Sequence, residues 1–200
     1  MKLQVQESVS EFYRVVSVDT DVIGRETVGR CGGSNNDKGE FIVGFALSFM
    51  DLTSSAFDAG GGIPTRHTGE GEDVSPALSW SGAPDGTRSF ALICHDPDAP
   101  LVSPGNYGFV HWVLYGIPAD VTGLPEGVED YVQGANNFGD PGYGGPMPPE
   151  GHGTHHYFFW LLALDSEPDL EPGLTMWELL DKIEPSVIAM NRLVGTYSRA

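Results

Sequence analysis

The chain has 200 residues, of which 40% are hydrophobic, so it is long enough for one domain with a full core. Its formal charge of −18, from 28 acidic and 10 basic residues, argues against nucleic acid as a partner, because such a surface repels phosphates. No apolar run approaches the roughly 18 residues of a membrane-spanning helix, and the N-terminus lacks a signal-peptide core, so we expect a cytoplasmic protein without an integral membrane segment. The charge is compatible with life at high salt, where repulsion is screened, or with an ordinary acidic protein.

The first part of the chain carries little structural signal. We expect residues 1–40 to form an N-terminal extension and residues 41–200 to form the folded domain. Strand-like composition occurs at Phe12–Val18 and at Phe41–Phe49, with a polar turn or linker between them.

The two cysteines, Cys31 and Cys94, form no metal or redox motif. Cys94 lies inside an apolar run, where a small buried side chain is typical. A disulfide between the two is the alternative. We expect no cofactor.

Apolar segments separated by turns rich in Gly and Pro predict strands. Buried strands are expected at Ser89–Cys94, Phe109–Ile117 and Tyr157–Leu164. Val74–Trp80 predicts a shorter strand, which Pro76 confines to an edge or a bend. Several short strands of this kind indicate a mainly β fold, and we expect an antiparallel β-sandwich.

Helix is expected only near the C-terminus. Thr175–Glu178 has the sequence of a capping box, and apolar residues follow at helical spacing as far as Ile183. Pro185 would end this helix and begin a second one. The second helix would have an apolar face and a glycine cap formed by Val187, Met190, Val194 and Gly195. The predicted sandwich therefore carries short C-terminal helices.

A long loop rich in Gly and Pro leads into the third buried strand. Structureless loops of more than about 12–15 residues are usually functional or disordered. This one is stiffened by four prolines, which favours a binding loop: Pro141, Pro146, Pro148 and Pro149. Because side chains alternate along a strand, His155 and Tyr157 share one face, and His156 lies on the other.

Further polar side chains occur at the ends of the other strands. Asp96 and Asp98 belong to the kinked segment His95–Pro100, which can accommodate a cis X-Pro bond, and His111 lies in the second buried strand. Imidazole and phenol groups donate hydrogen bonds, and loop N–H groups can form an anion-holding nest. A carboxylate can orient a histidine or receive an amine. The set predicts a site for a small phosphate-containing or zwitterionic ligand.

Other interpretations stay open for the same residues. Taken singly, His111 and Tyr157 are more often core residues, and the aspartates belong to a rigid turn. A metal-dependent hydrolase is the alternative function, although no HExxH spacing supports it. Its ligands would come from His95, Asp96, Asp98, His111, His152 and His155. A serine hydrolase is disfavoured because no GxSxG motif occurs.

Several separated motifs carry a resemblance to a known family. Asp96–Pro100, His111–Val113 and Pro148–Tyr157 resemble the two signature segments of the phosphatidylethanolamine-binding protein family. The stretches FDAGGGIP, VSPALSW, FGDPGYGGPMPPEG and LVGTYSR resemble its bacterial and archaeal branch, the YbhB/YbcL Raf kinase inhibitor-like proteins. The resemblance covers about Phe45–Arg199.

The resemblance implies a β-sandwich with a small anion-binding cavity at one rim. The cavity would be lined or flanked by Asp96, Asp98, His111, Pro148, Pro149, His155 and Tyr157. It implies a non-enzymatic protein that binds phosphate-like groups, including phosphatidylethanolamine headgroups, and that inhibits a kinase or protease in some members. His156 departs from the usual arginine, and Pro185-Ser186 departs from a common Gly-His. The oligomeric state stays open, a dimer included.

Overall fold

The structure, a computed structural model, describes residues 47–99 and 107–199, so the predictions for residues 1–40, for Phe12–Val18 and for Cys31 lie outside it. The elements in chain order are β1 (Asp51–Ser54), η1 (Thr65–His67), β2 (Leu78–Ser81), β3 (Ser89–Asp96), β4 (Phe109–Pro118), β5 (Gly123–Leu124), β6 (Val132–Gln133), β7 (His155–Leu164), α1 (Met176–Ile183), η2 (Glu184–Ser186) and β8 (Val187–Tyr197). The two η elements are single 3-10 turns. No helix within these residues has the length and apolar content needed to cross a bilayer.

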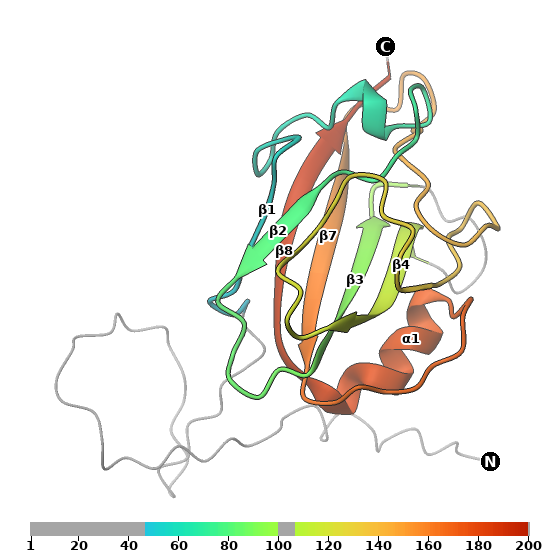
Figure 1. Cartoon of the computed structure of the whole chain (residues 1–200). Coiled ribbons are helices and arrows are strands. Elements are labelled where there is room, and N and C mark those ends of the chain that lie inside the picture. The colour runs from blue at the N-terminus through green and yellow to red at the C-terminus, as the bar shows by residue number, and fades with distance from the viewer. Residues whose placement is uncertain (1–46, 100–106, 200) are drawn as a thin grey trace, which may run out of the picture. The chain divides into compact units, whose positions relative to one another are not determined.

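The strands form two antiparallel sheets, which confirms the predicted mainly β fold (Figure 1). The larger sheet has the order β6-β4-β3-β7-β8 and the smaller one the order β1-β2-β5. The three predicted buried strands correspond to β3, β4 and β7, each slightly longer than expected. The strand predicted at Val74–Trp80 begins only at Leu78, after Pro76, and the described end of Phe41–Phe49 is not strand.

Apolar side chains cover both faces of the larger sheet. One cluster lies between the two sheets, where Trp80 of β2 packs with Phe90 of β3. A second cluster lies on the opposite face and includes Ile93 of β3 and Leu179 of α1. The central strands are therefore buried on both sides, which is why they appear in the sequence as nearly continuous apolar runs.

Helix α1 forms as predicted. The Thr175 hydroxyl accepts a hydrogen bond from the Glu178 amide while the Glu178 carboxylate accepts one from the Thr175 amide, so the capping box is complete. Met176, Leu179 and Ile183 are its buried residues. The helix ends at Ile183, and Pro185 follows within the turn η2.

The predicted second helix is wrong, because Val187–Tyr197 forms the strand β8. It pairs with β7 from Val187 to Tyr197 and so satisfies the backbone groups along one edge of β7. Gly195, expected as a helix cap, lies opposite Tyr157 in this pairing. A Cβ atom on Gly195 would stand 2.6 Å from Ile63 Cγ1 and 2.8 Å from Phe57 Cε2, so the glycine is needed for close packing.

Strand β4 contains a β-bulge next to the candidate site. Cys94 of β3 pairs with Trp112, whereas the next residue, His95, pairs with Val110. His111 is therefore the extra residue on β4. Trp112 packs in the cluster between the sheets and Val110 in the cluster on the other face, so the bulge changes which side chains face the inner cluster.

Candidate functional site

The predicted site residues lie at one end of the larger sheet. Strand β3 ends at Asp96, the antiparallel β4 begins at Phe109, and β7 begins at His155 (Figure 1). Helix α1 lies toward the other end of the sheet (Figure 1). The antiparallel order thus brings together polar groups from three distant segments.

Asp96 and His155 form a buried pair. His155 Nδ1 lies 2.7 Å from Asp96 Oδ2, and the two residues are 3% and 2% exposed. Asp96 Oδ1 accepts hydrogen bonds from the amides of Asp98 at 2.8 Å and Ala99 at 3.2 Å. Both carboxylate oxygens are therefore engaged, and the carboxylate fixes His155 with a proton on Nδ1. The Asp96–Pro97 bond is trans, so a cis bond, which the sequence allowed, does not occur there.

His111 is held by the main chain of Gly144. Its Nδ1 donates to the Gly144 carbonyl at 2.6 Å, and the Gly144 amide donates to the His111 carbonyl at 2.9 Å. The ring also contacts Phe109 and Phe138, with centroids 4.9 and 5.7 Å away. Burial lowers the pKa of His111 from 6.5 to about 4. His111 is therefore neutral at neutral pH, and because Nδ1 holds its proton, Nε2 can only accept.

Tyr157 completes the group of buried polar side chains. Its ring centroid lies 5.1 Å from that of His111 in an edge-to-face contact. Its hydroxyl is buried and has no hydrogen-bond partner among residues 47–99 and 107–199, a state shared only with Ser75 Oγ and Trp80 Nε1 in that part of the chain. Burial, and secondarily the charge of Asp96, raises the pKa of Tyr157, so the hydroxyl keeps its proton. An unsatisfied buried hydroxyl costs about 1–3 kcal/mol, so this donor is suited to an incoming acceptor.

Asp98 is engaged on the outer side of β7. Its Oδ2 accepts from the His156 amide at 2.8 Å and from His156 Nδ1 at 2.7 Å, and both side chains are exposed. Burial alone would raise the pKa of Asp98, but the hydrogen bonds from His156 outweigh it and lower that pKa. His156, on the face opposite His155 as expected, therefore forms an ion pair when protonated and attaches the Asp98 turn to β7.

The proline-rich loop is fixed by the C-terminal end of the chain. Arg199 Nη1 donates to the Pro148 carbonyl at 3.3 Å, and Arg199 also pairs with Glu70. Pro148 is buried, whereas Pro149 is exposed. The Gly145 amide donates to Asp73 at 2.6 Å, and the Gly144 amide is bound to His111. These two N–H groups of the predicted anion nest are therefore already occupied.

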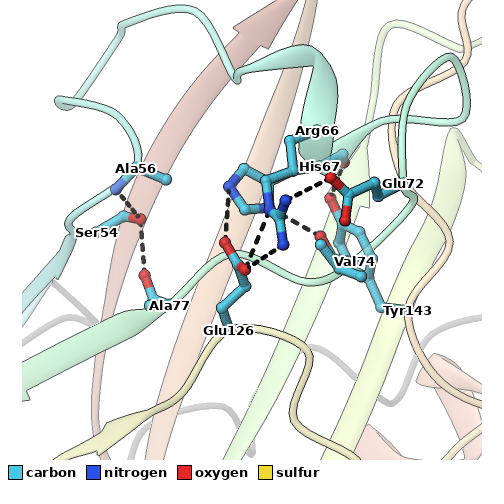
Figure 2. Close-up of polar contacts among 9 residues, drawn as sticks. All are labelled: Ser54, Ala56, Arg66, His67, Glu72, Val74, Ala77, Glu126 and Tyr143. Carbon is cyan, nitrogen blue, oxygen red and sulfur yellow. Dashed lines mark hydrogen bonds and ion pairs between the residues drawn. The ribbon is translucent and has the colours of Figure 1, made fainter.

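A third buried histidine, His67, contacts Tyr143 of the same loop. Figure 2 shows His67, whose Nδ1 lies 2.9 Å from the Val74 carbonyl and whose Nε2 lies 3.7 Å from Glu126 Oε2. The Tyr143 hydroxyl donates to the His67 carbonyl at 2.7 Å. No local sequence pattern predicts this contact, because His67 and Tyr143 are 76 positions apart.

The residues proposed for zinc do not gather into a metal site. Within the described ranges, no three His, Cys, Asp or Glu side chains are placed to hold a metal ion together. His95 Nε2 instead lies 2.7 Å from the Tyr107 carbonyl, and His152 stacks on His155 with centroids 6.0 Å apart. Cys94 is buried as a free thiol.

Comparison with known proteins places this arrangement in a family. The sequence model of the phosphatidylethanolamine-binding protein family matches residues 53–198. A UPF0098 protein of Methanothermobacter thermautotrophicus is 46% identical over an alignment of 157 residues, and the match covers 75% of this chain and 99% of that protein. A UPF0098 protein of Aquifex aeolicus is 40% identical over 80% of this chain and 98% of its own length.

Solved structures agree with the sequence comparison. A phosphatidylethanolamine-binding protein homologue of Chlamydia trachomatis has a TM-score of 0.70 and 38% identity, and the match covers 76% of this chain and 98% of that one. YbcL of E. coli, described as a member of the mammalian PEBP family, has a TM-score of 0.70 and 34% identity, with 76% and 100% covered. The chain therefore belongs to the phosphatidylethanolamine-binding protein family, in its bacterial and archaeal branch.

Proposed function

We propose that the chain is a non-enzymatic binding protein whose site takes a small phosphate-like group, from a phosphatidylethanolamine headgroup or another phosphoryl compound. Membership of the family supports a binding protein in general. The observation that carries the proposal is the Tyr157 hydroxyl, which is buried beside His111 and has no acceptor among the described residues. A phosphate oxygen supplies the acceptor that this hydroxyl lacks.

The other polar groups support the same ligand, with a condition on protonation. His155 has its proton on Nδ1, so its Nε2 donates to an anion only as the imidazolium. His111 is subject to the same condition because its Nδ1 is bonded to Gly144. Since burial keeps His111 neutral, an anion that uses it as a donor must bind together with a proton.

Phosphorylethanolamine is the probe that tests the site. Parent protein is expected to bind O-phosphorylethanolamine weakly in titration calorimetry, and His155→Ala to lose at least about tenfold in affinity, the effect of one charge-assisted hydrogen bond. His156→Ala, a change on the opposite face of β7, serves as the control and should bind like the parent. Inorganic phosphate and ethanolamine, titrated separately, identify which half is recognised. Equal affinities of His155→Ala and the parent would contradict the assignment of the ligand site to His155 and its neighbours.

Proton uptake gives a second test with sulfate, whose charge does not change between pH 8 and pH 5. We expect sulfate affinity to rise about tenfold over this range, because His111 gains a proton as the anion binds. Calorimetry in two buffers of different ionisation enthalpy counts the protons taken up. The rise should be smaller in His111→Gln and unchanged in His156→Gln, whereas an affinity independent of pH in the parent would contradict proton-coupled binding.

A further inference from the structure

Asp73 has an unusual backbone conformation close to the site. Its φ of 56° lies in the left-handed region, which aspartate tolerates better than most residues but seldom adopts. The residues on both sides are fixed (Figure 2). The Glu72 carboxylate pairs with Arg66, and the Val74 carbonyl accepts from His67. A strained conformation persists where its surroundings over-determine it in this way.

The carboxylate of Asp73 is directed at the loop that holds His111. Asp73 Oδ1 accepts a hydrogen bond from the Gly145 amide at 2.6 Å. A Cβ atom on Gly145 would lie 2.5 Å from the His67 carbonyl oxygen and 2.6 Å from Asp73 Oδ1, so this backbone has no room to move closer. The Gly145 amide and the Gly144 carbonyl belong to the same peptide unit. One end of this unit donates to Asp73, and the other end accepts the hydrogen bond from His111 Nδ1.

We propose that Asp73 is a positioning residue for His111. By binding the Gly145 amide, it fixes the plane of the peptide whose carbonyl, on Gly144, accepts from His111 Nδ1 at 2.6 Å. That carbonyl keeps the proton of the neutral ring on Nδ1 and sets the orientation in which Nε2 meets a ligand. The inference deepens the proposed function and depends on it for the role of His111, but the effect on the tautomer does not require a ligand.

Two substitutions separate the carboxylate from the backbone strain. Asp73→Gly accepts a positive φ but offers no acceptor to Gly145, whereas Asp73→Asn tolerates the left-handed region and keeps an acceptor. We expect Asp73→Gly to show a mixture of His111 ring tautomers in ¹⁵N-detected NMR and an affinity for inorganic phosphate reduced about fivefold. Asp73→Asn should keep the Nδ1–H tautomer and most of the affinity. Rescue by asparagine would identify hydrogen bonding, not charge, as the cause.

The outcomes distinguish this inference from the proposed function. If Asp73→Gly keeps the parent's His111 tautomer, the positioning role is refuted, whether or not the affinity for phosphate changes. If the parent binds no phosphate but the tautomer changes in Asp73→Gly, the positioning of His111 stands and the proposed ligand fails. Should Asp73→Gly not fold, the Gly145 amide proton of Asp73→Asn is decisive. It should move upfield because a neutral acceptor is weaker, and an unchanged shift would overturn the proposal.

Discussion

The free energy of unfolding should fall by about 2 kcal/mol between pH 7 and pH 5 through His111 alone. The pKa of His111 is lowered from 6.5 to about 4 by burial, so the unfolded chain binds a proton in this range that the folded protein excludes. The stabilising effect is complete above pH 6.5 and is lost as the pH falls toward 4. The full difference corresponds to roughly 3 kcal/mol.

Urea unfolding of the parent and of His111→Gln at pH 7 and pH 5 measures this effect. Other titrating groups are present in both proteins. The parent and the variant should therefore differ in their loss of unfolding free energy between pH 7 and pH 5 only through His111. The variant should lose about 2 kcal/mol less than the parent. If His111→Gln loses stability as steeply as the parent, His111 is not held neutral by the fold.

Gly195→Ala should destabilise the protein by about 2 kcal/mol, a typical cost of overpacking a core. The added methyl group would stand 2.6 Å from Ile63 Cγ1 and 2.8 Å from Phe57 Cε2, which are both buried. Gly195 is also the cross-strand partner of Tyr157. The displacement caused by the added methyl group should therefore disturb both the candidate site and the core.

Gly62→Ala is the matched control for this change. Nothing lies within 4 Å of a Cβ at Gly62, which bridges to Thr196 beside Gly195. Alanine there should be neutral or slightly stabilising, because it restricts the unfolded chain. Thermal unfolding of both variants gives the comparison. Equal stabilities would mean that the packing around Gly195 relaxes without cost.

The central strands could be predicted from the sequence because a strand buried on both faces consists of a nearly continuous apolar run. Ser89–Asp96 has one residue that is only partly buried, so its composition alone indicates a strand in the middle of a sheet. The capping box at Thr175 was equally local. The family resemblance pointed to the same fold, and membership is confirmed.

Strand β8 could not be predicted in this way, because its identity depends on a distant partner. Val187, Met190 and Val194 have a spacing that suits a helix, but the open edge of β7 offers backbone hydrogen bonds along the whole segment. Only Ala189, Leu193 and Gly195 are fully buried in the strand. The long-range pairing outweighed the local periodicity.

The candidate site was predictable to different degrees. Strand alternation places His155 and Tyr157 on one face, and both are buried there as expected. The position of His111 beside Tyr157 depends on the β-bulge in β4, and the alternation of side chains along a regular strand does not predict a bulge. The contact between Asp73 and Gly145 joins residues 72 positions apart, and the partner of Asp73 is a backbone amide that any residue but proline would offer.

The order of strands in the larger sheet has a consequence for how the protein reaches its native state. Strands β3 and β7 are neighbours, although Asp96 and His155 are separated by 59 positions, so a large loop must close before they pair. Chains dominated by such non-local pairings fold on millisecond to second timescales. The candidate site, assembled where these strands meet, therefore forms only after this loop has closed.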